Sequence, residues 1–364
     1  MKIFKTLNTT FSKSDTTLYK GIGILLIILH NFMHNHGGMQ IENEFTFKPE
    51  NIHKFIAITF GGDLLHFFSG VFSFLGHYGV QIFFFFSAYG LTIQYEKWKG
   101  ANFNFVYHRL KKIYFLMLYG ILICISIYWF TGVSYGLMGT VIRFLILAST
   151  LNNFTTISLF SGPFWFFAPI IQFYVLFPIL YRFVTKFEIS KIYIPIVLSL
   201  ILIYLFYYTL DGVSLPYNGV YKFSLFRNII GHLPELLLGI IMGHFKFKSF
   251  SPLVIIISLI VFVGTQIFEW MFPLSFLSAT IFLISLSDLL VRNLRGFFRR
   301  IISYLGKISM ILFIVNSPFR LLFYNFIKRG ELSWGNVFLF FLFLFPLSHV
   351  LYLIYSFLSK KLKI

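Results

Sequence analysis

Long apolar segments recur along the whole of this 364-residue chain and constrain its fold more than any other feature. A helix needs roughly 20 apolar residues, within a range of about 17 to 25, to cross a hydrocarbon core of about 30 Å. Because a backbone in lipid must satisfy its own hydrogen bonds, such segments are predicted to be helices. Ten segments are long enough: 18–34, 78–96, 113–131, 162–184, 191–210, 228–245, 252–270, 273–291, 301–324 and 335–358. The sequence therefore predicts an all-α, polytopic membrane protein with about ten transmembrane helices.

The composition leaves too few polar residues for a separate soluble domain. Hydrophobic residues make up 58% of the chain and charged residues only 12%, against about half and a quarter in soluble domains. We therefore predict one integral-membrane domain over residues 1–364. No small-residue cleavage site follows the first apolar segment, so that segment is predicted to be a retained helix. The single cysteine, Cys124, excludes an internal disulfide and a cysteine-based metal site, and we expect no metal.

The cations alternate along the chain as a membrane topology requires. If the N-terminus is cytoplasmic, one side receives most of the Lys and Arg residues, and the other side receives a few cations mixed with acids. Such an excess places both termini in the cytoplasm. The net charge of +18 is thus explained by topology, and nucleic acid is not expected as a partner. We expect a multi-pass protein of a bacterial inner (cytoplasmic) membrane, in contact with membrane lipids.

Two stretches on the outer side are longer than the other loops. The first, 37–75, carries Glu42, Glu44 and Asp63, and carboxylates commonly hold hydroxyl-rich substrates. Acceptor binding is therefore predicted there, with Glu42 as a candidate, although acidic loop residues more often only face water. The second, 132–161, contains the apolar stretch 137–150, which is short and carries Arg143. We predict that this stretch is a helix in the outer interface.

The first apolar segment ends in a cluster of imidazoles. His30 follows Lys20 by ten residues, about 15 Å of helix, and His34 lies on the same face as His30. Gly23 shares that face and would let a neighbouring helix or a ligand approach. An ionisable group at such depth is a functional candidate by default, although a lone histidine near a helix end often only sits in the headgroup layer. We predict a functional role for His30, then His34, and less strongly for His36.

Several short motifs follow one another in order along the chain. They are 20–30 (KGIGILLIILH), 79–88 (GVQIFFFFSA), 108–114 (HRLKKIY), Trp165 with 172–174 (QFY) and Pro178, 227–239 (RNIIGHLPELLLG), and 305–309 (LGKIS) with 316–318 (NSP). No single motif is specific, but together and in register the chain resembles the acyltransferase 3 family of integral-membrane acyltransferases. The resemblance covers most of the chain.

The chain departs from this family pattern at several positions. The basic residue and the histidine of the first span are usually eleven positions apart, whereas Lys20 and His30 are ten apart, which turns them about 80° away from each other around a regular helix. A lysine also lacks the bidentate grip of the usual arginine. Gln81, Ala88 and Asn316 stand where an acid, a glycine and a histidine are common. These changes indicate a divergent branch that keeps His30.

The resemblance implies an enzyme that takes an acyl group, usually acetyl from cytoplasmic acetyl-CoA, to a hydroxyl of a glycan or lipid-linked glycan on the outer side. A hydroxyl needs a base, and histidine is suited to that task at neutral pH. His30 is the predicted general base, assisted by His34, and transient acylation of the imidazole is an open alternative. Glu235, in an apolar segment, is predicted to orient His30 or to pair with Arg227.

The resemblance also indicates where donor and acceptor bind. Acyl-CoA carries several phosphates, so its site should be basic and cytoplasmic; candidates are Arg109, Lys111, Lys112, Tyr114 and Lys20. Gln172 and Asn316 either hold the thioester carbonyl or only tie two helices together. Trp165 is a candidate for stacking on a sugar ring, although interfacial tryptophan is common. Asn31 and Gln81 complete the predicted substrate-binding residues.

The main alternative is a polytopic transporter that flips a lipid-linked oligosaccharide without chemistry. A flippase should show charged residues dispersed through many spans and traces of internal repeats. In this chain the intramembrane polar groups gather in a few segments, and no repeat is evident. A polysaccharide polymerase or ligase is a third possibility, but it would ordinarily need a large outer loop, which the sequence lacks.

Overall fold

The computed structural model describes residues 10–35, 39–98, 102–133, 135–155, 159–213, 222–326 and 332–364, and His36 lies outside them. Helices make up nearly all of this part of the chain, and none of the described residues forms a strand. The all-α prediction is thus confirmed. The α-helices are α1 (Lys13–Met33), α2 (Pro49–Phe60), α3 (Leu64–Leu75), α4 (Gly79–Lys97), α5 (Asn102–Phe130), α6 (Gly136–Ala148), α7 (Phe167–Val184), α8 (Tyr193–Thr209), α9 (Leu233–His244), α10 (Pro252–Ile267), α11 (Ser275–Asn293), α12 (Gly296–Lys307), α13 (Ser309–Phe326) and α14 (Trp334–Lys361).

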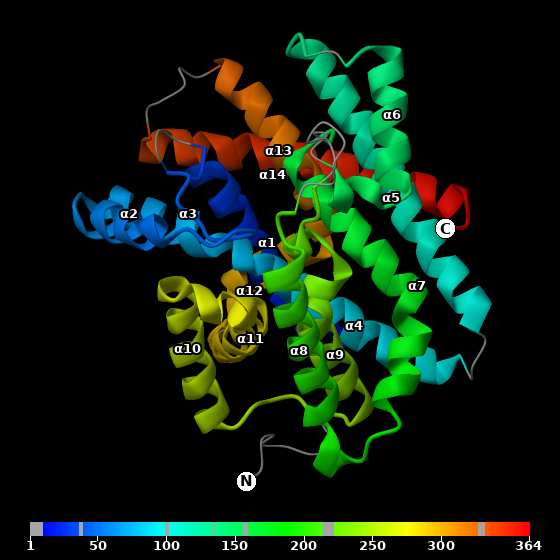
Figure 1. Cartoon of the computed structure of the whole chain (residues 1–364). Helices are drawn as coiled ribbons and strands as arrows, with labels where there is room; N and C mark the ends of the chain where they lie inside the picture. The colour runs from blue at the N-terminus through cyan, green and yellow to red at the C-terminus, as the bar shows by residue number, and fades with distance from the viewer. Residues whose placement is uncertain are drawn as a thin grey trace.

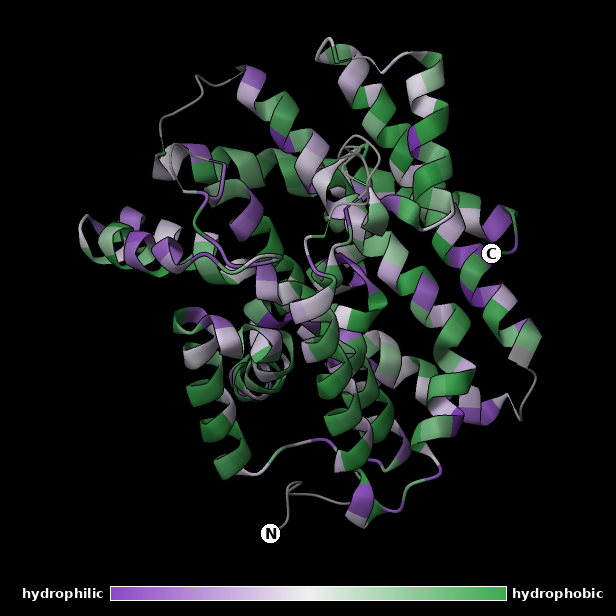
Figure 2. Cartoon of the chain, in the orientation of Figure 1, coloured by the Kyte–Doolittle hydropathy of each residue, from purple (hydrophilic) through white to green (hydrophobic). Residues whose placement is uncertain are grey.

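Each predicted apolar segment coincides with helix, although not all of the helices are of full spanning length. Seven helical stretches in the described residues are long and apolar enough to cross a membrane, or eight if α12 and α13 form one broken span. α9 and α10, in the predicted sixth and seventh segments, are shorter. Apolar residues dominate the helices in Figure 2. The count of ten and the orientation of the termini stay predictions.

Two details of the predicted organisation are wrong. Segment 301–324, predicted as one span, belongs to two helices, α12 and α13, that meet at an angle of 77°. α12 carries cations along one face, and charged side chains are costly in an apolar layer, so the segment is not one continuous apolar helix. The stretch 37–75, predicted as a loop, contains α2 and α3, and α3 runs into α4 through the short 3₁₀ turn η1 (Gly76–Tyr78).

Helix α1 is the element around which the others gather (Figure 1). Ser12 and Asp15 close its N-terminus with a capping box, in which each side chain accepts a hydrogen bond from the other residue's backbone N–H. α1 packs against η1 and against the α-helices α3, α4, α11, α12 and α13. Figure 1 shows α2 and α3 on one side of α1 and the long helices α13 and α14 above it.

Glycines bring two of these helices into backbone contact with α1. A Cβ atom on Gly306 of α12 would lie 1.8 Å from the carbonyl oxygen of Thr17, and one on Gly21 would lie 2.0 Å from that of Ile302. On the side facing α4, a Cβ atom on Gly79 would lie 2.6 Å from the carbonyl oxygen of Gly23. The predicted role of Gly23, to let a neighbouring helix approach, is confirmed.

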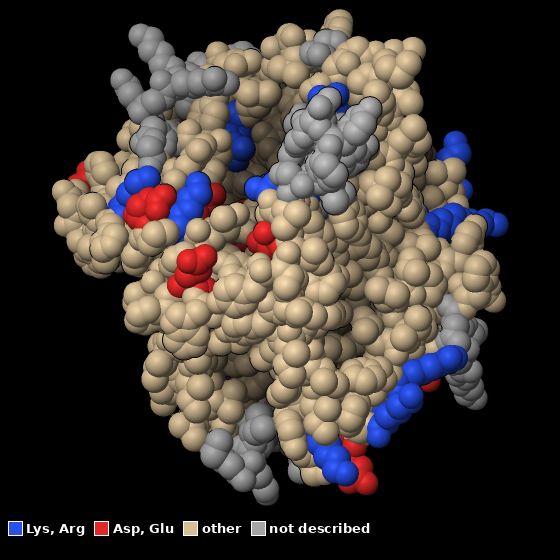
Figure 3. Space-filling view, in the orientation of Figure 1, with Lys and Arg blue, Asp and Glu red and all other residues tan. Residues whose placement is uncertain are grey.

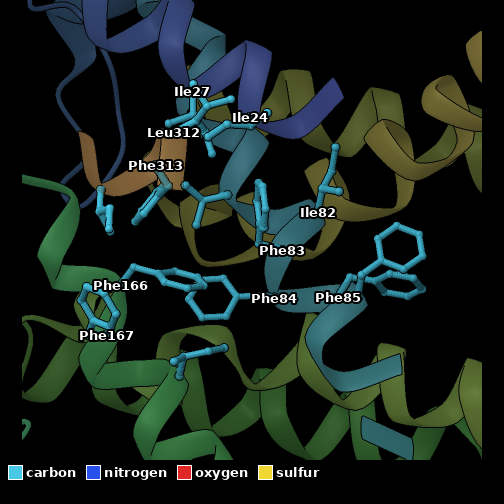
Figure 4. Packing of buried hydrophobic residues seen from close by; sticks show 14 of the residues in the cluster. Ile24, Ile27, Ile82, Phe83, Phe84, Phe85, Phe166, Phe167, Leu312 and Phe313 are labelled. Atoms are coloured by element: carbon cyan, nitrogen blue, oxygen red, sulfur yellow. The ribbon is translucent and has the colours of Figure 1, made fainter. Parts of the chain in front are cut away.

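The many phenylalanines fill the core between α1, α4, α7 and α13. Figure 4 shows Phe84 next to Phe166, with Ile27 and Phe313 on the other side of the cluster. The centroids of the Phe84 and Phe166 rings are 4.9 Å apart, and Phe83, Phe84 and Phe85 are almost entirely buried. The phenylalanine run of α4 therefore packs the protein interior and leaves the polar end of α1 to form a site.

Candidate functional site

A cavity of about 320 Å³ lies at the C-terminal end of α1. Its walls come from the last turns of α1, the segment that follows it, η1, the first turn of α4, the turn before α7, the segment around Arg227 and helix α13. The lining residues are Ile27, His30, Asn31, His34, Asn35, Glu42, Glu44, Phe45, His77, Val80, Gly162, Pro163, Trp165, Arg227, Phe313 and Arg320. The cavity thus brings together predicted site residues that are far apart in the sequence: His30, Asn31, His34, Glu42 and Trp165.

The tautomer of His30 follows from its hydrogen bonds. Its Nδ1 lies 3.0 Å from the carbonyl oxygen of Ser73 and 3.3 Å from that of Phe72. A carbonyl only accepts, so Nδ1 carries the proton and donates it, while Nε2 keeps its lone pair. The close approach of Gly76, where a Cβ atom would lie 2.7 Å from the Cβ of His30, lets the end of α3 lie close enough to α1 for these bonds. His30 is therefore a buried imidazole with a fixed ring orientation and a basic nitrogen.

Two further histidines stand beside His30. The His34 ring centroid is 5.1 Å and the His77 centroid 5.4 Å from that of His30. Nδ1 of His34 also lies 2.8 Å from a carboxylate oxygen of Glu42. His77 comes from η1 and is buried. No periodic pattern in the sequence predicts its approach to His30. Among the described residues, no three His, Cys, Asp or Glu side chains are arranged to hold a metal ion.

The two glutamates of the cavity differ in their electrostatics. Burial alone raises the pKa of Glu42, but contact with His34 outweighs it, so the pKa lies below its ordinary value. For Glu44, burial and then the neighbouring Glu42 charge raise the pKa to about 8, against an opposing effect of Arg227. One carboxyl is thus ionised and the other keeps a proton near neutral pH. In Figure 3 acidic and basic atoms lie close together on the upper left of the face shown.

Arg320 supplies a cation to the cavity from α13. Its Nη1 donates a hydrogen bond of 2.5 Å to the backbone carbonyl oxygen of Asn31, on α1. Sequence reasoning missed Arg320, although a cation inside the predicted span 301–324 was the signal that could have found it. Arg227 lines the same cavity, and its guanidinium lies 4.5 Å from the centre of the Phe45 ring.

Glu235 does not contact His30 or Arg227, so the partners predicted for it are wrong. It is fully buried, and its carboxylate lies 2.7 Å from Nδ1 of His232, also fully buried. Nε2 of His232 donates to the carbonyl oxygen of Phe226 at 3.1 Å. Glu235 pairs with His232 because the two residues are three positions apart and therefore lie on the same face at the start of α9.

The His232–Glu235 pair touches the cavity through Trp165. The His232 ring stacks on the indole of Trp165 with centroids 5.8 Å apart, and on Phe84 and Phe276 at 4.0 and 4.9 Å. Trp165 in turn meets Phe45 edge to face at 5.1 Å. The predicted sugar-stacking residue is thus held between a buried polar pair and a ring of the cavity wall.

Unlike Asn31, three of the predicted amide side chains do not line the cavity: Gln81, Gln172 and Asn316. Gln172 accepts a hydrogen bond from the backbone N–H of Ile229 and lies 3.4 Å from the Thr150 hydroxyl, contacts that tie segments together. Asn316 donates to backbone carbonyls of its own helix. Gln81 is buried in α4, and its Oε1 has no hydrogen-bond partner among the described residues. Their roles in substrate binding stay predictions.

The residues predicted to bind the donor do not converge on one pocket. Arg109 donates to Gln94 and lies over the Phe105 ring, Lys111 reaches the carbonyl oxygen of Lys363, and Lys112 is exposed. The Tyr114 hydroxyl donates to the carbonyl oxygen of Ala148 and lines a separate apolar groove of about 810 Å³. Lys20 lies in another cleft, at the opposite end of α1 from His34.

Comparison with known proteins gives one family. The family model described as "Acyltransferase domain" (Acyl_transf_3) matches residues 17–355, nearly the whole chain. A search of curated proteins and a search of solved structures each found no match.

Proposed function

The chain belongs to the acyltransferase 3 family, and from this premise we propose that it moves an acetyl group from cytoplasmic acetyl-CoA to a hydroxyl of an extracytoplasmic glycan. Family membership and the apolar helices make it a multi-pass membrane acyltransferase. The donor, the acceptor and the roles of individual residues belong to the proposal, as does a bacterial inner membrane as its location.

The observation that carries the proposal is the fixed tautomer of His30. A base that takes a proton from a hydroxyl must present a lone pair to the substrate, and the bonds from Nδ1 to the carbonyls of Phe72 and Ser73 reserve Nε2 for that role. His30 also lines a cavity of a size suited to one sugar unit with a small acyl group.

The reaction can be written with these side chains. Nε2 of His30 takes the proton of the acceptor hydroxyl while its oxygen attacks the thioester carbonyl carbon. Negative charge then develops on the carbonyl oxygen, and the remaining N–H groups of Arg320 are the donors proposed to stabilise it. As the carbon–sulfur bond breaks, the imidazolium of His30 returns its proton to the CoA thiolate. A transient acyl-imidazole would use the same nitrogen as nucleophile, so both routes depend on Nε2.

The remaining walls of the cavity are suited to an acceptor rich in hydroxyl groups. Trp165 offers a flat apolar face, and the Glu42–His34 pair together with Asn31 offers acceptors and donors beside it. Sugars combine flat apolar faces with hydroxyls, so this wall fits the proposed glycan. The same small volume argues against the flippase alternative, since a lipid-linked oligosaccharide needs a continuous path.

The test is transfer from labelled acetyl-CoA by purified protein in lipid nanodiscs. We expect label to appear in a hydroxyl-rich acceptor, or in water as acetate, with native protein, and a loss of about 10²–10⁴-fold with His30→Ala. His66→Ala is the matched control, because His66 is exposed and pairs only with Asp63 at the start of α3. Native protein that consumes no acetyl-CoA, and that acetyl-CoA does not protect against thermal unfolding, would refute the enzyme reading.

A further inference from the structure

A second cleft, lined by cations, lies at the N-terminal end of α1. Its volume is about 990 Å³. Five of its lining residues are basic and come from two helices: Lys13 and Lys20 of α1, and Arg299, Arg300 and Lys307 of α12. Its other described lining residues include hydroxyl groups from Ser14, Thr17 and Ser303 and the rings of Tyr304 and Tyr352, but no Asp or Glu.

The bend between α12 and α13 creates this cleft. Because α12 turns away by 77°, it crosses α1 where Gly306 meets Thr17, instead of continuing parallel to α13. Its cleft residues Arg299, Arg300, Ser303, Tyr304 and Lys307 recur at helical spacing, so they share one face. The first turn of this helix also carries exposed Phe297 and Phe298. α12 thus presents one polar, cationic face to the cleft.

None of the described residues that line the cleft neutralises these charges. The nearby acids are engaged elsewhere: Asp15 is 2.9 Å from Lys248, and Asp288 contacts Arg292 and Tyr19. Within the cleft, Arg299 donates to the backbone carbonyl oxygen of Val291, and Lys307 lies 5.6 Å from the centre of the Tyr352 ring. Neither contact removes positive charge. Like charges held in a recess repel one another and favour a bound anion.

We infer that this cleft binds the phosphate groups of the acyl donor, a step that rests on the proposed function. Phosphate is the anion that clustered Lys and Arg side chains hold best, through charge-assisted hydrogen bonds. Several phosphates on one molecule match several cations in one recess better than a single lipid phosphate does. The cleft and the histidine cavity lie at the two ends of α1, so a donor held here can extend its acyl arm along that helix.

This inference moves the donor site away from the residues that the sequence favoured. Arg109, Lys111 and Lys112 lie on α5 and line neither the cleft nor the cavity. Of the predicted donor residues only Lys20 belongs to the cleft. The two sets of cations can therefore be tested against each other with matched substitutions.

The experiment measures binding of CoA, of 3′-dephospho-CoA and of pantetheine to full-length protein in zwitterionic nanodiscs by calorimetry. We expect affinity to fall in that order and Arg300→Gln/Lys307→Gln to weaken CoA binding about tenfold. Arg300 and Lys307 are exposed, so the double variant should fold, which a native-like melting temperature verifies. Lys111→Gln/Lys112→Gln removes the same charge from the other site and should leave the CoA affinity unchanged.

Three outcomes would overturn the inference. The first is unchanged CoA affinity in Arg300→Gln/Lys307→Gln with a loss in Lys111→Gln/Lys112→Gln, while the native protein still transfers acetyl; this leaves the proposed function standing. In the second, Arg300→Gln/Lys307→Gln keeps its CoA affinity but loses bound phosphatidylglycerol in nanodiscs that contain this lipid. That result would assign the cleft to lipid headgroups. The third, native protein that neither binds CoA nor transfers acetyl, overturns the inference and the proposed function together.

Discussion

The two ends of α1 handle charge in opposite ways. At the C-terminal end, the cavity mixes histidines, carboxylates and arginines, and many of these groups already have partners, such as His34 with Glu42 and Arg320 with the Asn31 carbonyl. At the N-terminal end, the cleft collects cations without any acid among its described lining residues. A paired network fixes the orientation of each group, whereas a recess of one sign attracts an oppositely charged ligand. The comparison indicates that the cavity is suited to the reaction and the cleft to binding the phosphates of the donor.

The largest effect that would sharpen this comparison is expected at Arg320. If Arg320 stabilises the developing oxyanion, Arg320→Ala should lower kcat about 10²–10³-fold with little change in the KM for acetyl-CoA. Arg320→Lys should recover part of the loss, since it keeps a charge without the planar fork. Steady-state kinetics of the purified variants check this. A rise in the KM for acetyl-CoA at constant kcat would instead make Arg320 a binding residue. The cavity would then contribute to donor binding as well as to chemistry.

A second substitution should disturb the cleft end of α1. In Gly306→Ala the new Cβ atom meets the Thr17 carbonyl oxygen at 1.8 Å, so α12 must move away from α1. We expect a loss of about 1–3 kcal/mol in stability, measured as a lower unfolding temperature in detergent, and weaker CoA binding. Gly90→Ala is the control, because nothing lies within 4 Å of its added carbon. An unchanged melting temperature for Gly306→Ala would show that the crossing of α1 and α12 is not tight.

The smallest effect is expected from pH, at Glu44 in the cavity wall. The pKa of Glu44 is raised to about 8 in the folded protein from an ordinary value of 4.5. Its contribution to stability is therefore most favourable below pH 4.5 and is lost as the pH rises toward 8. Glu44→Gln should flatten the decline of the melting temperature between about pH 5 and about pH 8. Parallel curves for native and variant protein would place Glu44 in contact with water.

The sequence predicts the helices and part of the site because both follow from local pattern. Hydropathy reports each apolar segment, and the four-residue spacing of His30 and His34 places them on one face. Hydropathy averages over direction, however, so it missed the 77° bend that separates α12 from α13. His77 and Arg320 reach the cavity through tertiary packing, which no local pattern records.

The donor residues show a second limit of local reasoning. Nearly every predicted cytoplasmic loop is basic, so the cations of α5 and α12 look alike in sequence. Only the crossing of α1 and α12 at Gly306 distinguishes them, because it brings cations of two helices into one recess. Glu235 illustrates the reverse case. The sequence predicts a partner for this buried carboxylate. The partner in the structure is His232, three residues away, and not one of the predicted partners His30 and Arg227.

The backbone contacts on both sides of α1 have a consequence for which acyl groups can be used. Gly21 and Gly306 fix α1 against α12, and Gly23 and Gly79 fix it against α4, so α1 cannot slide along either neighbour. The span from the cleft to Nε2 of His30 is then a constant length set by the helix. In the proposed arrangement the length of α1 therefore sets the depth of the thioester carbonyl of a donor that is anchored by its phosphates. A longer acyl chain would need additional space in the cavity beyond Nε2 of His30.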